Sequence, residues 1–158
     1  MSEPYHAPSY DASGLRFAIF AARFNESLVR RMADAAAEVL EKRGAAKDAI
    51  ERFHVPGSFE LPLAARWIAA TGRFDAVLAF GVLIRGETEH FRLVAEAAAD
   101  GLQRVALETG VPVLNGVLAT YDAAQAEART GGRLGNRGAD VALAAVQMAR
   151  LKREVHPE

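Results

Sequence analysis

The chain has 158 residues, of which 51% are hydrophobic and 25% are charged, which is enough for one well-buried domain but short for two. A net charge of -1 provides no basic field for a nucleic-acid backbone, and the absence of cysteine excludes disulfides and thiol catalysis. Because no run of some eighteen apolar residues occurs either, we expect a cytoplasmic protein that binds neither nucleic acid nor a membrane.

The first fourteen residues differ in composition from the rest. They contain prolines and serines where a signal peptide would need a basic start and an apolar core. We expect residues 1–14 to form a flexible arm and residues 15–158 to form a single domain.

Strand and helix patterns then alternate along the chain. Strands are expected within residues 15–25, 50–55, 76–84 and 111–119; the first begins with a dense apolar run and the third is apolar on both faces. Helix-forming stretches are expected at residues 26–43, 61–70, 91–109, 123–129 and 139–153. Strands that are apolar on both faces and alternate with helices indicate a parallel sheet covered on each side. The fold class is therefore α/β, a three-layer α/β/α sandwich of the flavodoxin-like kind with a central four-stranded parallel sheet.

Unusual side chains gather where these strands end. In open α/β sheets, ligands bind beyond the carboxyl ends of the strands. The segments at those ends are residues 22–25, 56–60, 85–90 and 120–122. They form the candidate site.

The stretch GVLIRGET, residues 81–88, has the glycine spacing of a phosphate-binding loop without its context. The residues between the glycines belong to a strand, and Glu87 stands where the motif needs lysine, so a nucleoside triphosphatase is rejected. Gly86, Glu87 and Thr88 instead precede a helix, whose first N–H groups and dipole favour an anion.

His90 follows in the first turn of that helix. A histidine there can simply cover the helix end, but beside an anion site it can give or take a proton near neutral pH. His6, His54 and His156 lie in the arm, a strand and the tail. No two histidines have metal-ligand spacing, so we expect no metal site.

Four further side chains each allow two interpretations. Phe24 and Phe59 can stack on a planar ring or fold back into the core. The turn at residues 56–57 is expected to present the carboxylate of Glu60 instead of burying it. Arg129 can serve the end of its own short helix or clamp a phosphate with two hydrogen bonds.

Covalent catalysis is not expected. The lysines, Lys42, Lys47 and Lys152, lie at or beyond helix ends and away from the strand termini, which argues against a Schiff base. The stretch PGSFE lacks the second glycine of a nucleophile elbow. The site is therefore interpreted as one for positioning and proton transfer.

Five segments together resemble a known family. The chain resembles the 6,7-dimethyl-8-ribityllumazine synthases of riboflavin biosynthesis, over roughly residues 15–150, in ARFNESL, VPGSFELPLAA, GVLIRGETEHF, GVPVLNGVL and AEARTGGRLGNRGAD. The resemblance implies condensation of 5-amino-6-(D-ribitylamino)uracil with 3,4-dihydroxy-2-butanone 4-phosphate, without cofactor or metal.

The same resemblance implies residue roles. Phe24 would stack on the pyrimidine with Asn25 nearby, and His90 would shuttle protons. The other implied contacts are Ser58, Phe59 and Glu60 to the ribityl side, Leu83 and Ile84 to the uracil edge, Gly86, Glu87, Thr88 and Arg129 to the phosphate, and Asn115 and Arg137 from a neighbouring subunit. The chain departs from the common family pattern at Asn115, Ala119 and Arg137.

An assembly is implied as well. Family members form pentamers with active sites between subunits, and some build decamers or icosahedral shells of 60 subunits. The loop GGRLGN resembles that of shell-forming members, riboflavin synthase is a candidate partner, and residues 1–14 would lie along a neighbour's sheet edge.

Two other functions compete with synthesis. A non-catalytic flavin or ribityl-compound binder would use the same pocket and leave His90 idle. A phosphoacceptor receiver needs clustered acids at the end of the first strand, and residues 22–25 contain none.

Overall fold

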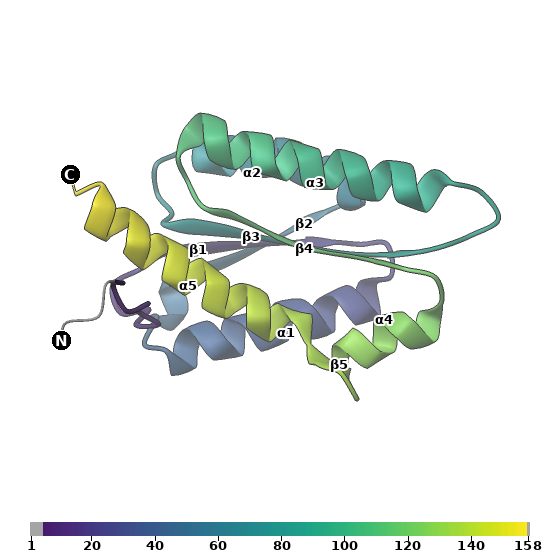
Figure 1. The fold of residues 1–158 in the computed structure, drawn as a ribbon, viewed down its shortest axis with the longest axis horizontal. Helices are drawn as coiled ribbons and strands as arrows, with labels where there is room; N and C mark the ends of the chain where they lie inside the picture. Colours follow the sequence, from purple (N-terminus) through teal and green to yellow (C-terminus); the bar gives the residue numbers. More distant parts are fainter. Residues whose placement is uncertain (1–4, 158) are drawn as a thin grey trace.

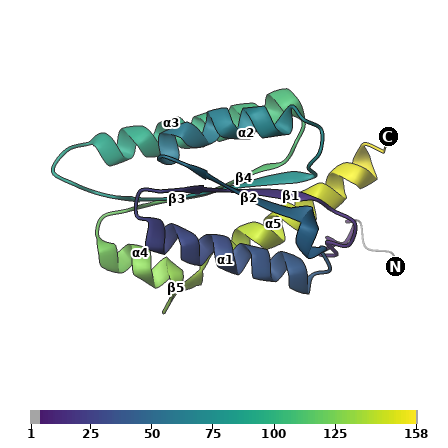
Figure 2. The same cartoon turned by 180° about the vertical axis from the view of Figure 1, so that it is seen from behind.

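A computed structural model describes residues 5–157 and shows a sheet between two layers of helices (Figures 1 and 2). The strands are parallel and run in the order β2-β1-β3-β4. Their bounds are β1 (Phe17–Ala22), β2 (Ile50–Val55), β3 (Ala76–Ile84) and β4 (Val113–Thr120). The expected three-layer α/β/α fold with a four-stranded parallel sheet is confirmed.

Two groups of helices cover the two faces of the sheet. One face carries α2 (Leu61–Ala69) and α3 (His90–Thr109). The other carries α1 (Glu26–Lys42), α4 (Ala123–Arg129) and α5 (Arg137–Val155). The bounds of β2, β3 and α4 coincide with those expected from the sequence.

The central strands are apolar because both of their faces are covered. All six residues of β1 and the first seven of β3 are buried. The edge strands β2 and β4 expose polar residues such as Arg52 and Asn115. Continuous apolar runs therefore mark the middle of the sheet.

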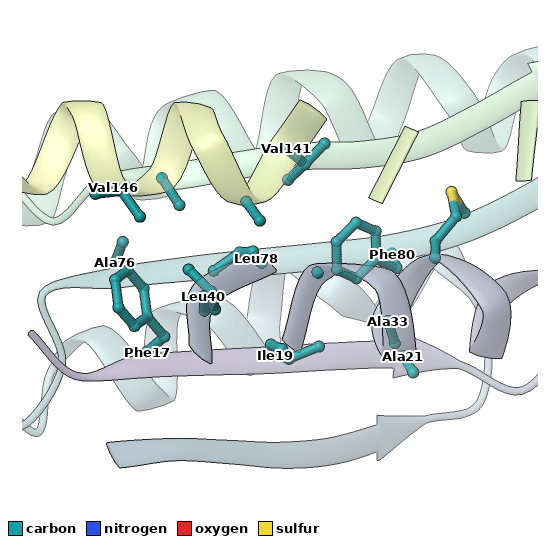
Figure 3. Packing of buried hydrophobic residues seen from close by; sticks show 14 of the residues in the cluster. Phe17, Ile19, Ala21, Ala33, Leu40, Ala76, Leu78, Phe80, Val141 and Val146 are labelled. Atoms are coloured by element: carbon teal, nitrogen blue, oxygen red, sulfur yellow. The ribbon is translucent and has the colours of Figure 1, made fainter. Parts of the chain in front are cut away.

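The sheet separates two hydrophobic clusters. Phe17, Ile19 and Phe80 pack against α1 and α5, where Figure 3 shows Leu40 and Val146 facing them. On the opposite face, side chains of β1 and β3 pack against α2 and α3. Alternate residues of one strand thus supply both clusters.

Short elements not expected from the sequence occur in the connections. They are the 3₁₀ helices η1 (Lys47–Ala49) and η2 (Ser58–Glu60), and the two-stranded ribbon of β5 (Thr130–Gly132) and β6 (Gly135–Asn136). The ribbon lies in the glycine-rich loop before α5. It leads directly into that helix, which begins two residues earlier than expected because the Asn136 side chain accepts a hydrogen bond from the N–H of Gly138 at 2.8 Å.

The segment before β1 is packed against the domain. Ala12 is fully buried, and its N–H donates to the carbonyl of Arg43 at 2.9 Å. Arg150 donates to the carbonyl of Asp11 at 2.6 Å. Of the arm expected at residues 1–14, residues 1–4 lie outside the described part of the chain.

Both ends of the described chain lie near the amino ends of the strands (Figure 1). His6 pairs with Glu154 in the last turn of α5. His156 and Pro157 line a hollow together with Asp75, which precedes β3. No helix within residues 5–157 combines the length and the hydropathy needed to cross a bilayer.

Candidate active site

A cavity of about 670 Å³ opens beyond the carboxyl ends of β1 and β3, on the face covered by α2 and α3. Its walls come from the β1–α1 turn, from η2, from the end of β3 and from the first turns of α3. Among its lining residues are the expected Phe24, Asn25, Ser58, Phe59, Glu60, Leu83, Ile84, Gly86, Thr88 and His90. The fold thus brings most of the expected site residues to one place.

The two phenylalanines of the cavity point outward. The side chains of Phe24 and Phe59 are 72% and 64% exposed, so neither folds back into the core. A Cβ added to Gly57 would lie 3.3 Å from the ring of Phe24, so this glycine lets the ring rest on the turn that leads to η2. Each of the two rings can therefore offer a face to a planar ligand.

Asn25 combines an unusual backbone with an unusual hydrogen bond. It is the one residue other than glycine with positive φ within residues 5–157, at φ 56° and ψ 42°. It precedes α1, but its side chain does not cap that helix. Its Nδ2 instead donates to the carbonyl of Val82 in β3 at 2.8 Å.

Ser58 lies on the floor of the cavity against Gly81. Its side chain is 4% exposed. A Cβ on Gly81 would lie 2.1 Å from the Oγ of Ser58, which is closer than atoms can pack. The glycine that mimics a phosphate loop in the sequence therefore allows η2 to approach β3 closely.

Glu60 is exposed, as the turn at residues 56–57 predicts. Its Oε2 accepts a hydrogen bond from the N–H of Gly57 at 3.0 Å. The carboxylate thereby closes η2 and stays at the wall of the cavity. Its second oxygen is left for other partners.

His90 is the first residue of α3 and is exposed toward the cavity. Its N–H donates to the Oγ1 of Thr88 at 3.3 Å, a local hydrogen bond of the turn that leads into the helix. Glu89 bonds Arg92 at 2.9 Å. This hydrogen bond, aided by the charges of Arg92 and Arg85, lowers the pKa of Glu89.

Aromatic contacts at the mouth were not anticipated from the sequence. The rings of Phe91 and Tyr121 meet edge to face at 6.2 Å, and the guanidinium of Arg85 lies 5.7 Å from the centre of the Tyr121 ring. They join the start of α3 to the end of β4. The available signal was that all three residues flank strand ends, but nothing in the sequence pairs Phe91 with Tyr121.

Four expected residues do not line this cavity. Arg129 donates to the carbonyl of Gln125 at 3.0 Å, within α4 on the opposite side of the sheet (Figure 1). Arg137 begins α5 on that same side. Glu87 is exposed in the loop before α3, and Asn115 lies on the edge strand β4.

The Oδ1 of Asn115 accepts a hydrogen bond from the N–H of Val117 at 2.9 Å. The N–H groups of Val77 and Arg85 donate to the carbonyls of Pro112 and Thr120, so even-numbered residues along β4 direct their backbone groups toward β3. Odd-numbered residues of β4 therefore direct their N–H and C=O groups toward the open edge of the sheet. Asn115 thus satisfies one of the free donors of this edge.

Within residues 5–157, no cluster of three or more histidine, aspartate or glutamate residues is placed to hold a metal ion.

Comparison with known proteins points to one family. The sequence profile described as 6,7-dimethyl-8-ribityllumazine synthase matches residues 14–153. The chain is 46% identical over 140 residues to the 6,7-dimethyl-8-ribityllumazine synthase of Desulfotalea psychrophila, and the match covers 89% of this chain and 90% of the relative. It is 45% identical over 140 residues to the enzyme of the same name from Halorhodospira halophila, with the same coverage.

Proposed function

Because the chain belongs to the 6,7-dimethyl-8-ribityllumazine synthase family, we propose that the cavity beyond β1 and β3 is where it carries out that enzyme's reaction. The enzyme condenses 5-amino-6-(D-ribitylamino)uracil with 3,4-dihydroxy-2-butanone 4-phosphate. The products are 6,7-dimethyl-8-ribityllumazine, phosphate and water, and the reaction belongs to riboflavin biosynthesis.

One observation carries the assignment of the site. Exposed aromatic faces, a histidine and the open end of a central strand all border the same cavity. A condensation of two small molecules needs them held together, and positioning can supply about 7–11 kcal/mol of a barrier. General acid–base help adds roughly 10²–10⁴-fold.

We assign the roles as follows. The ring of Phe24 stacks on the uracil, and Ser58, Phe59 and Glu60 hold the ribityl chain. The backbone of Leu83 and Ile84 meets the uracil edge. The substrate supplies its own amine as the nucleophile, so no lysine is required.

The phosphate group is placed at the start of α3, beside Gly86, Glu87 and Thr88. The first N–H groups of a helix and its dipole stabilise an anion there. His90 then stands between this phosphate and the ring, where it takes the proton from the amine as it attacks the ketone and returns protons to the departing groups.

The site is completed by other copies of the chain. Arg129, Asn115 and Arg137 do not line the cavity of their own chain, and we assign them to the cavity of a neighbour. A pentamer, with larger shells as a further step, fits this assignment. Residues 1–14 are proposed to lie along a neighbouring sheet, riboflavin synthase is proposed as a partner, and the cytoplasm is proposed as the location.

The test is a direct assay. The purified protein is mixed with both substrates, and lumazine fluorescence and released phosphate are followed together. We expect one phosphate for each lumazine formed. Riboflavin binding without turnover would instead identify a non-catalytic flavin binder.

A further inference from the structure

The end of β3 extends beyond its neighbour β1. The last residue pair between the two strands is Ala21 and Phe80, whereas β3 continues to Ile84. Val77 and Arg85 donate to carbonyls on the β4 side, so the even-numbered residues of β3 direct their N–H and C=O groups toward β1. Beyond Phe80, these groups face a position that no strand occupies.

The next donor of β1 is used elsewhere. The N–H of Phe24, which would continue the ladder to Val82, donates instead to the carbonyl of Pro56 at 3.3 Å. Asn25 fills that position, because its Nδ2 donates to the Val82 carbonyl at 2.8 Å. The left-handed backbone of Asn25 turns its side chain back onto β3 while the chain departs into α1.

The amide of Asn25 therefore ends the ladder at Val82, at the wall of the cavity. Ile84, the next even-numbered residue, keeps an N–H and a C=O directed at the same open side, and it lines the cavity. One donor and one acceptor from a single residue match the alternating C=O and N–H groups along the edge of a uracil ring. A ligand edge can occupy the place of a missing strand in this way.

We propose that Asn25 is a positioning residue for the uracil ring: by holding the carbonyl of Val82 in place of a strand, it fixes the N–H and C=O of Ile84 as the edge on which the ring docks. The inference rests on the proposed function, because it takes the uracil substrate as the ligand. Asn25 acts here through the backbone of β3 and makes no contact with the ribityl chain.

The test uses three variants and three probes. Asn25→Gly keeps the left-handed backbone and removes the amide, Asn25→Ala removes the amide and adds backbone strain, and Asn25→Asp keeps the shape but places an oxygen against the Val82 carbonyl. The probes are 6-(D-ribitylamino)uracil, 6-aminouracil and inorganic phosphate, with dissociation constants measured by calorimetry and thermal stability measured in parallel.

We expect each variant to weaken binding of both uracil probes about tenfold, which corresponds to losing about one of the two hydrogen bonds that Ile84 makes to the ring, and to leave phosphate binding unchanged. Asn25→Ala should melt at a lower temperature than Asn25→Gly yet bind the uracils equally. In hydrogen exchange, 6-aminouracil should protect the Ile84 amide in the wild type and protect it less in Asn25→Gly.

Three results would overturn the inference. The first is weaker binding of the ribityl probe alone, which would indicate direct contact with the polyol. The second is a loss of uracil affinity that follows the melting temperature, and the third is unchanged uracil affinity. Turnover of the wild type is measured separately. Failure to form lumazine would remove the proposed function, whereas the pattern across the variants decides the role of Asn25.

Discussion

His90 occupies the point where the cavity, the helix start and the candidate phosphate position meet. Its N–H is held by Thr88, while its ring is exposed to the cavity. Histidine exchanges protons near neutral pH, so its position suits a proton carrier. Removing the ring should therefore affect the chemical step more than binding.

For His90→Ala we expect kcat to fall by roughly 10²–10⁴-fold, with the KM for the uracil substrate changed only slightly. Steady-state kinetics with each substrate varied in turn measure both constants. The conservative His90→Gln variant keeps a polar side chain of similar size and should be equally slow. An unchanged kcat in both variants would remove His90 as the proton carrier.

Single residues also mark the limit of prediction from the sequence. The position of His90 followed from its place after the carboxyl end of a predicted strand, but the outward rings of Phe24 and Phe59 did not, because an apolar residue at a strand end fits either environment. The bond from Asn25 to Val82 joins residues 57 positions apart. Such pairs depend on where two strands end in space, which local patterns do not encode.

At the scale of elements, the close approach of η2 to β3 depends on Gly81. A Cβ at that position would lie only 2.1 Å from the Oγ of Ser58. The next nearest atoms, the Cβ of Ser58 at 3.2 Å and the Cγ2 of Val117 at 3.6 Å, are much farther away. The hydroxyl is thus the main obstacle.

Gly81→Ala should lower the free energy of unfolding by about 1–3 kcal/mol through overpacking. Adding Ser58→Ala should recover part of that loss, because the remaining Cβ contact needs only a small shift. Chemical denaturation of the two single variants and the double variant measures the coupling. Equal losses in Gly81→Ala and the double variant would mean that another atom blocks the position.

Elements with strong apolar patterns were predictable, and short ones were not. The bounds of β3 follow from its continuous apolar run, and those of β2 and α4 from strand-forming and helix-forming residues that end at clear turn residues. The 3₁₀ helix η2 depends on the Glu60 carboxylate reaching the N–H of Gly57, and β5 and β6 contain too few side chains to form a pattern. These elements are specified by single contacts, which periodicity does not reveal.

At the scale of the whole molecule, the assignment proposed for Arg129 makes the site depend on more than one chain. The phosphate clamp assigned to Arg129 lies across the sheet from the cavity of the same chain. If Arg129 acts in a neighbour's cavity, each site needs two chains. The sequence suggests this only through family resemblance, since no pattern within one chain encodes a contact between chains.

Arg129→Ala should raise the KM for the phosphate substrate. When equal amounts of Arg129→Ala and His90→Ala chains are assembled together and assayed at a phosphate-substrate concentration far below the raised KM, where each variant alone is slow, we expect activity to return to about one quarter of the wild-type rate. Random head-to-tail pairing leaves that share of sites with both residues intact. Each variant assembled alone is the control, and light scattering confirms the size of the mixed assembly. Continued inactivity of the mixture would place Arg129 in the site of its own chain.

The first and last described residues lie near the amino ends of the strands, whereas the cavity opens beyond the carboxyl ends. The nine residues of β3 span about 30 Å between these regions. A reporter domain or an immobilising support joined close to Tyr5 or Pro157 would therefore sit far from the entrance. The protein could be tethered at either terminus while metabolites still diffuse freely into its opposite end.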